Sequence, residues 1–283
     1  MRRKPVVLIA LFALVGALGV VAVVRSFSGS IKLTQRGPAC TVRADGEVTL
    51  DSTQMANAAT ITAVGLRRKM PERAVVIALA TALQESKLEN VEHGDRDSLG
   101  LFQQRPSQGW GTPEQIRDPR YSSGRFYASL QKVKGWKEMR VTDAAQRVQR
   151  SAYPNAYEKW VDEATVLARA LTGRATRAVE CTVTGEPVLR GAAAAAALME
   201  GLQLDWGTGL AAAAVGAPGL TVPVKDANSG WRYAHWLVSH ARDTGLERVR
   251  FADLEWHAPG GKWQQVTGER VAGNGKVVAE VFR

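Results

Sequence analysis

Cysteine is scarce in this sequence, and that scarcity excludes several classes of protein. Among 283 residues there are only two cysteines, Cys40 and Cys181, and four scattered histidines. Two thiols exclude a small disulfide-rich scaffold and a zinc site built from four thiolates. None of the histidines lies near a close pair of cysteines, so we predict neither a metal site nor a cofactor.

Long basic runs are also missing. The formal net charge is +10, yet no five consecutive residues are basic. Residues 185–283 are balanced in charge, so the excess is spread over the residues before them. Without a basic block or a DNA-binding motif, we predict no nucleic-acid partner. An anionic lipid surface or an anionic polymer remains compatible with a dispersed positive charge.

Charged residues are absent from residues 5–24, a run of 20 that lies between Arg2-Arg3-Lys4 and Arg25. A helix of that length spans about 30 Å, the thickness of a bilayer core. Residues 1–25 are therefore predicted to be a cytoplasmic basic end and a transmembrane anchor. The stronger charge before the run predicts a single-pass protein of the cell membrane, with the C-terminal part outside the cytoplasm.

A cleaved signal peptide is the alternative to this anchor. The apolar run is long for a signal peptide, and β-branched residues occupy the place of a small-residue cleavage site. A metal transporter is excluded, because one apolar span cannot form a pathway and this span holds no charge or ligand cluster.

Export has a consequence for the two cysteines, because thiols oxidise outside the cytoplasm. Cys40 and Cys181 both precede Thr-Val and bracket a stretch with the character of one domain. We predict that they form a disulfide. Two unrelated buried cysteines are the alternative.

The exported chain is predicted to have an α+β fold, with segments of different character. Residues 26–39 are polar and contain Gly, Ser and Pro, which indicates a linker. Residues 40–182 contain residues typical of helix starts and ends, and apolar residues at helical spacing. A Gly- and Asp-rich stretch interrupts this helical pattern. Residues 183–222 are a small-residue-rich helical or linker segment, and 223–283 are predicted to form a small α+β domain of unknown role.

Three motifs in residues 40–182 carry the candidate chemistry. They are Gln84-Glu85-Ser86, the run from Asp95 to Gln104 with Gly109-Trp110-Gly111 after it, and the run from Gln149 to Tyr157. Their order and separation resemble the lytic transglycosylases of the lysozyme-like superfamily. More closely, residues 40–181 resemble an exported actinobacterial lysozyme-like domain.

The resemblance implies that Glu85 is the catalytic acid and that Gly-Leu-Phe-Gln at 100–103 lines a sugar cleft, with Phe102 where methionine is usual. Tyr153 and Asn155 match the family's Ala-Tyr-Asn element, which supports the glutamate, although Pro154 intrudes between them. Aromatic residues of the motifs are candidates for stacking on sugars, or else core residues. The predicted substrate-binding residues are Ser86, Gly100, Leu101, Phe102, Gln103, Trp110, Tyr153, Asn155 and Tyr157.

The residue types suit glycoside chemistry on their own account. Cleavage of a β-1,4 glycosidic bond needs a carboxylic acid that donates a proton to the leaving oxygen. The apolar helix that leads to Glu85 would favour the neutral acid. A transglycosylase needs no second carboxylate, whereas a hydrolase does, and Asp97 or Asp95 would supply it unless they only form turns.

Two functions remain from the sequence. The first is an anchored enzyme that cleaves peptidoglycan glycan strands, as a lytic transglycosylase or a muramidase. The second is a lysozyme-like module that binds or scaffolds the cell wall without cutting it. Both have peptidoglycan as partner, and the sequence identifies no protein partner.

Overall fold

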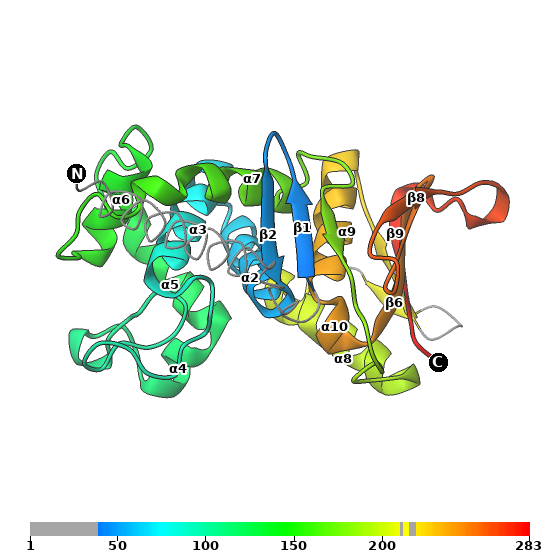
Figure 1. Cartoon of the computed structure of the whole chain (residues 1–283), viewed down its shortest axis with the longest axis horizontal. Coiled ribbons are helices and arrows are strands. Elements are labelled where there is room, and N and C mark those ends of the chain that lie inside the picture. Colours follow the sequence, from blue (N-terminus) through cyan, green and yellow to red (C-terminus); the bar gives the residue numbers. More distant parts are fainter. Residues whose placement is uncertain (1–38, 210–211, 215–218) are drawn as a thin grey trace, which may run out of the picture. The chain divides into compact units, whose positions relative to one another are not determined.

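The computed structural model describes residues 39–209, 212–214 and 219–283. The predicted anchor at 1–25 and nearly all of the predicted linker lie outside these residues. Within the described part of the chain, no helix is both long and apolar enough to cross a bilayer. Helices and antiparallel sheets are combined in the unit Gly37–Arg283, which confirms the α+β class (Figure 1).

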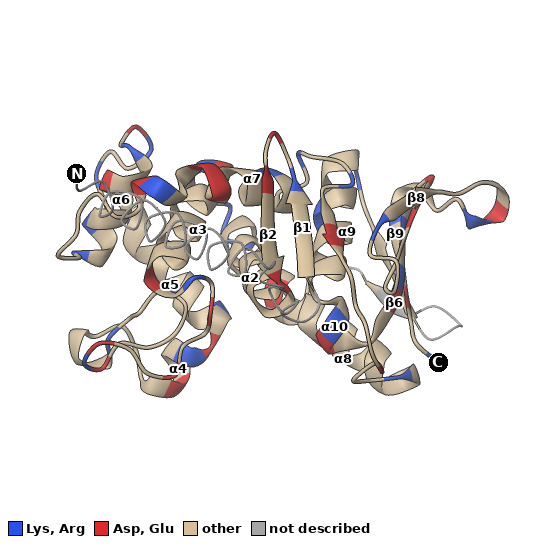
Figure 2. Ribbon diagram, viewed as in Figure 1, with Lys and Arg blue, Asp and Glu red and all other residues tan. Residues whose placement is uncertain are grey.

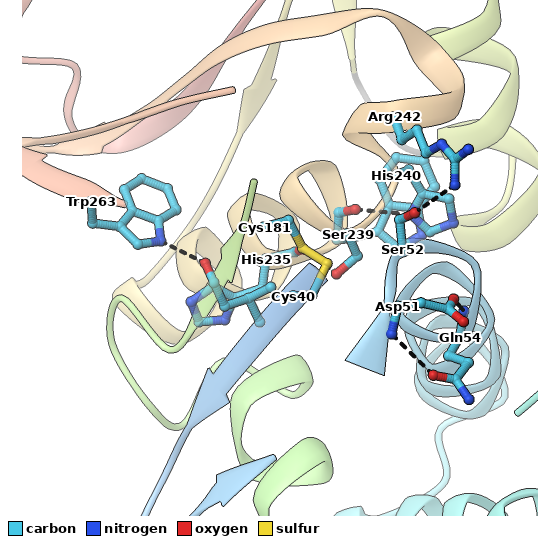
Figure 3. Close-up of a disulfide and its surroundings, with 12 residues drawn as sticks. Cys40, Asp51, Ser52, Gln54, Cys181, His235, Ser239, His240, Arg242 and Trp263 are labelled. Carbon is cyan, nitrogen blue, oxygen red and sulfur yellow. Dashed lines mark hydrogen bonds between the residues drawn. A yellow bond between two sulfur atoms is a disulfide. The ribbon is translucent and has the colours of Figure 1, made fainter. Parts of the chain in front are cut away.

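A small sheet joins the two ends of the predicted helical part. Its strands are β1 (Ala39–Arg43), β2 (Glu47–Asp51) and β3 (Val179–Cys181), in the antiparallel order β2-β1-β3. Cys40 lies directly opposite Cys181, and the two form the predicted disulfide across 141 residues of sequence (Figure 3). A bridge of this kind typically contributes about 2–4 kcal/mol to stability.

Two buried helices follow the first hairpin. Helix α2 (Ser52–Arg67) begins at Asp51, whose carboxylate accepts a hydrogen bond from the Gln54 amide in a capping box. Helix α3 (Glu72–Ser86) is buried through most of its length, as its apolar composition predicts. Lys87 ends it in a left-handed conformation, so the chain turns away immediately after Ser86.

Most of the remaining helices of this part pack against α3, and they follow the Gly- and Asp-rich stretch in sequence. That stretch contains no α-helix; it holds a tight backbone pair between Leu99 and Gln104 and the short 3₁₀ turn η1 (Pro106–Gln108). The helices and one further 3₁₀ turn after it are α4 (Pro113–Arg117), α5 (Pro119–Gln131), α6 (Val141–Gln149), η2 (Glu158–Trp160) and α7 (Val161–Leu171).

The C-terminal part has a larger antiparallel sheet with the strand order β4-β5-β9-β6-β7-β8. Helix α9 packs against its β6 and β9 strands. The elements are α8 (Gly191–Trp206), β4 (Ala213–Ala214), β5 (Gly219–Pro223), α9 (Ala227–Ser239), α10 (Ala241–Thr244), β6 (Leu246–Ala252), β7 (Leu254–His257), β8 (Trp263–Gln265), η3 (Gly268–Arg270) and β9 (Gly273–Val281).

A buried polar cluster joins the C-terminal part to the helical part. The Asp205 carboxylate of α8 is fully buried and accepts hydrogen bonds from Thr60 of α2 and Trp236 of α9, both at 2.8 Å. It also forms an ion pair of 2.6 Å with Arg120 of α5. Four helices therefore meet at one carboxylate, and the hydrophobic core continues from residues 40–182 into the tail.

His235 of α9 strengthens the same junction beside the disulfide (Figure 3). Its Nε2 accepts a hydrogen bond from the Ala178 amide at 3.0 Å, and its Nδ1 faces the Ala170 carbonyl at 2.8 Å. Burial lowers the pKa of His235 to about 4, so the ring is neutral near neutral pH. It therefore acts as a structural side chain.

Candidate active site

Glu85 lies in the last turn of α3, where the buried helix meets a pocket. Its Oε1 atom accepts a hydrogen bond of 2.8 Å from the hydroxyl of Tyr157. Burial, together with the neighbouring Glu85 carboxylate, raises the pKa of Tyr157 far above its usual value. The tyrosine is therefore a permanent donor that fixes the position of the carboxyl group.

The Gly-Leu-Phe-Gln turn is tied directly to the end of α3. The Ser86 hydroxyl donates to the Leu101 carbonyl at 2.8 Å. Gly100 has φ +71°, and a Cβ atom there would lie 2.7 Å from the Ile116 carbonyl oxygen, so only glycine fits. The turn closes through reciprocal backbone hydrogen bonds between Leu99 and Gln104.

Only part of this turn faces the pocket. Gln103 lines it, whereas Leu101 and Phe102 are fully buried. The Phe102 ring stacks on Phe126 with 4.7 Å between ring centroids. The Phe102 carbonyl accepts a hydrogen bond of 2.8 Å from Gln149 at the end of α6. Leu101 and Phe102 therefore anchor the turn in the core rather than contacting a ligand.

The pocket beside Glu85 has a volume of about 1080 Å³. Gln103, Trp110 and Ser151 line it, so each of the three sequence motifs contributes to it. This volume lies just above the range of about 300–1,000 Å³ for small-molecule sites. It is large enough for an extended ligand such as a segment of polymer.

In the third motif, Tyr157 supports Glu85, whereas the family pattern indicates Tyr153 and Asn155. Tyr153 is 75% exposed and Asn155 is exposed as well, and neither lines the pocket. The chain contains two Ala-Tyr pairs, Ala152-Tyr153 and Ala156-Tyr157, and the second one reaches Glu85. The second Ala-Tyr pair is the feature of the sequence from which Tyr157 could have been predicted as the residue that contacts Glu85.

Asp97 does not lie in the pocket that Glu85 lines. Its carboxylate accepts hydrogen bonds from the Ser107 amide at 2.8 Å and from Arg105 at 2.6 Å. Hydrogen bonds from Ser107, and then from Arg105, hold the pKa of Asp97 well below its usual range. The ionised Asp97 carboxylate therefore stabilises the loop. Asp95 does line the pocket, but its side chain is 92% exposed.

Gln84 and Lys87, one residue before and two residues after Glu85, make contacts that the motifs did not assign. The Trp160 indole donates to the Gln84 side chain at 2.9 Å. The Lys87 ammonium lies 4.3 Å from the centre of the Trp160 ring, in a cation–π arrangement. These contacts hold the end of α3 from the side of η2, and Trp160 is a packing residue of the site.

The lining of the pocket includes one carboxyl group, an amide and an indole, and the buried Tyr157 phenol holds the carboxyl group in position. Within the described ranges, no cluster of three or more His, Cys, Asp or Glu side chains is suitable for a metal ion. Comparisons with protein-family models and with curated proteins find no match for this chain.

Proposed function

We propose that this protein cleaves the glycan strands of peptidoglycan, with Glu85 as general acid and then general base. The observation that carries the proposal is the Glu85 carboxyl group, held by Tyr157 where a buried helix opens into a pocket of about 1080 Å³. Gln103 and Trp110 supply a hydrogen-bonding group and an aromatic surface in the same lining. Sugar polymers are bound by groups of these types.

Tyr157 also distinguishes the two carboxyl oxygens of Glu85. Its hydroxyl donates to Oε1, so Oε2 is the oxygen that carries the transferable proton. Donation of that proton to the glycosidic oxygen releases the leaving sugar, and the resulting carboxylate can accept a proton in the second step. The buried phenol stays protonated throughout, since its pKa is far above neutral.

The placement of the aspartates favours transglycosylation over hydrolysis. Hydrolysis by the two-carboxylate route requires a second carboxylate held beside the acid. Asp97 is occupied by Arg105 and Ser107, and Asp95 is an exposed loop residue. A transglycosylase needs only Glu85, because the 6-hydroxyl of the sugar acts as the nucleophile and yields a 1,6-anhydro end.

We propose further that the enzyme works outside the cytoplasmic membrane, on an N-terminal anchor. The uncharged run at residues 5–24 supports the anchor. The Cys40–Cys181 disulfide supports export, because such bridges persist in oxidising compartments.

Digestion of purified peptidoglycan by the wild-type protein, followed by mass analysis of the soluble fraction, tests this function. We expect muropeptides with 1,6-anhydro ends. Reducing ends would indicate a hydrolase instead. Sedimentation of the folded protein with the wall, without any soluble product, would contradict cleavage and support the alternative of a non-catalytic binding or scaffolding module.

A further inference from the structure

The pocket beside Glu85 is strongly positive. Its lining includes six cationic side chains but only two carboxylates, those of Glu85 and Asp95. The cations are Arg96, Arg105, Arg125, Lys132, Arg147 and Arg150. Figure 2 shows Lys and Arg spread over the ribbon as a whole, so this excess arises where side chains from separate elements meet at one pocket.

Four of these cations come from two helices and their C-cap residues. Arg125 and Lys132 lie seven residues apart on α5 and at its C-cap, with Ser129 between them, and all three line the pocket. This spacing places them on one face of the helix. Arg147 lies in the last turn of α6 and Arg150 is its C-cap residue. All four side chains line the pocket, and we call this set of residues the cationic wall.

The cationic wall is not neutralised by neighbouring acids. Arg105 is paired with Asp97, and Arg96 lies 3.9 Å from Asp95. The four residues of the wall form no ion pair with any other described residue. Lys132, Arg147 and Arg150 lie near helix C-termini, where cations interact favourably with the helix dipole. The dipole does not explain Arg125, nor why all four cations line the pocket of Glu85.

We propose that the cationic wall binds carboxylate groups carried on the side branches of the glycan, so that the site selects an acidic glycan over a neutral one. This inference rests on the proposed function and assigns specificity to Arg125, Lys132, Arg147 and Arg150. Like charges in a partly enclosed pocket raise the local potential and attract anionic ligands. Guanidinium groups also match the geometry of a carboxylate.

The test compares native peptidoglycan with the same material after its carboxyl groups are converted to neutral amides. Binding of the full-length protein is measured by sedimentation. Exposed charge pairs contribute modestly one by one, but four together predict that amidation weakens binding about tenfold or more. Added salt is expected to weaken binding to native walls more than to amidated walls.

A quadruple variant with glutamine at all four positions of the wall is expected to lose a similar factor on native walls and little on amidated walls. The matched control removes four exposed cations that lie outside the pocket lining. The control substitutions are Arg68→Gln, Lys69→Gln, Lys262→Gln and Arg270→Gln. Circular dichroism checks that both variants remain folded.

The outcomes separate this inference from the proposed function. Equal binding of the wild type to native and amidated walls, or equal losses in both quadruple variants, overturns the role of the wall. Failure of the wild type to sediment with native walls overturns it too. Release of soluble muropeptides is measured separately, and its absence overturns the cleavage proposal. Sedimentation still tests whether the cationic wall binds carboxylates.

Discussion

Replacement of Glu85 by glutamine is expected to lower the rate of glycan cleavage about 10²–10⁴-fold, the usual contribution of general acid–base catalysis. An amide has nearly the shape of a carboxyl group but supplies no acidic proton to the leaving oxygen. The amide oxygen can still accept the hydrogen bond from Tyr157. The pocket should therefore persist, and the variant should bind walls as the wild type does.

The measurement is the rate of muropeptide release, with sedimentation as the readout for binding. Glu89→Gln is the matched control, because Glu89 is exposed, lies only four residues further on and does not line the pocket. It should leave the rate unchanged. Cleavage at the wild-type rate by Glu85→Gln would show that another group performs the chemistry.

Replacement of Asp205 by alanine is expected to lower the free energy of unfolding by about 3–5 kcal/mol, the usual cost of removing one partner of a buried ion pair. Arg120 would lose the carboxylate that it meets at 2.6 Å. The hydroxyl of Thr60 and the indole of Trp236 would lose their acceptor at the same time. Unsatisfied buried donors add to the cost.

Urea denaturation followed by tryptophan fluorescence measures this change. Glu200→Ala on the same helix is the control, since Glu200 is exposed and should change stability by less than about 0.5 kcal/mol. Because Asp205 joins α2, α5, α8 and α9, we expect a single unfolding transition that shifts as a whole. A loss of less than about 1 kcal/mol would contradict the assignment of Asp205 as the main link between the two parts.

Several local features of this molecule follow directly from the sequence. Asp51 and the apolar residues after it predict the start of α2, and the capping box with Gln54 is present. The apolar run from Val75 to Leu83 predicts a buried helix that ends near Glu85, as α3 does. The disulfide follows from two cysteines in an exported chain. In each case the deciding interactions are local, or the choice of partners is small.

The contacts between the three motifs could not be predicted from the sequence. They depend on the path of the loops in the folded structure, which the spacing of residues along the chain does not determine. Tyr153 and Tyr157 flank Pro154, and only the packing of this loop on α6, where Thr142 donates to the Pro154 carbonyl at 3.0 Å, decides which one reaches Glu85. The tight turn at Gly100 likewise sends Phe102 into the core and leaves Gln103 in the pocket.

The contacts between the C-terminal part and the helical part also could not be predicted from the sequence. Turn signals in the C-terminal part predict a small α+β unit, yet the side chains of Asp205 and His235 bind partners in the helical part that lie more than 50 residues away in sequence. A buried aspartate has no sequence signature that distinguishes it from a surface one. Only the meeting of four helices identifies its role.

A crystal structure of the Glu85→Gln variant of residues 37–283 with an uncleaved peptidoglycan oligosaccharide would test the central claim most directly. The account predicts the glycan in the pocket lined by Gln103 and Trp110, with a glycosidic oxygen within hydrogen-bonding distance of the side chain at position 85. A glycan bound outside this pocket, or one whose glycosidic oxygens all lie beyond the reach of that side chain, would contradict it.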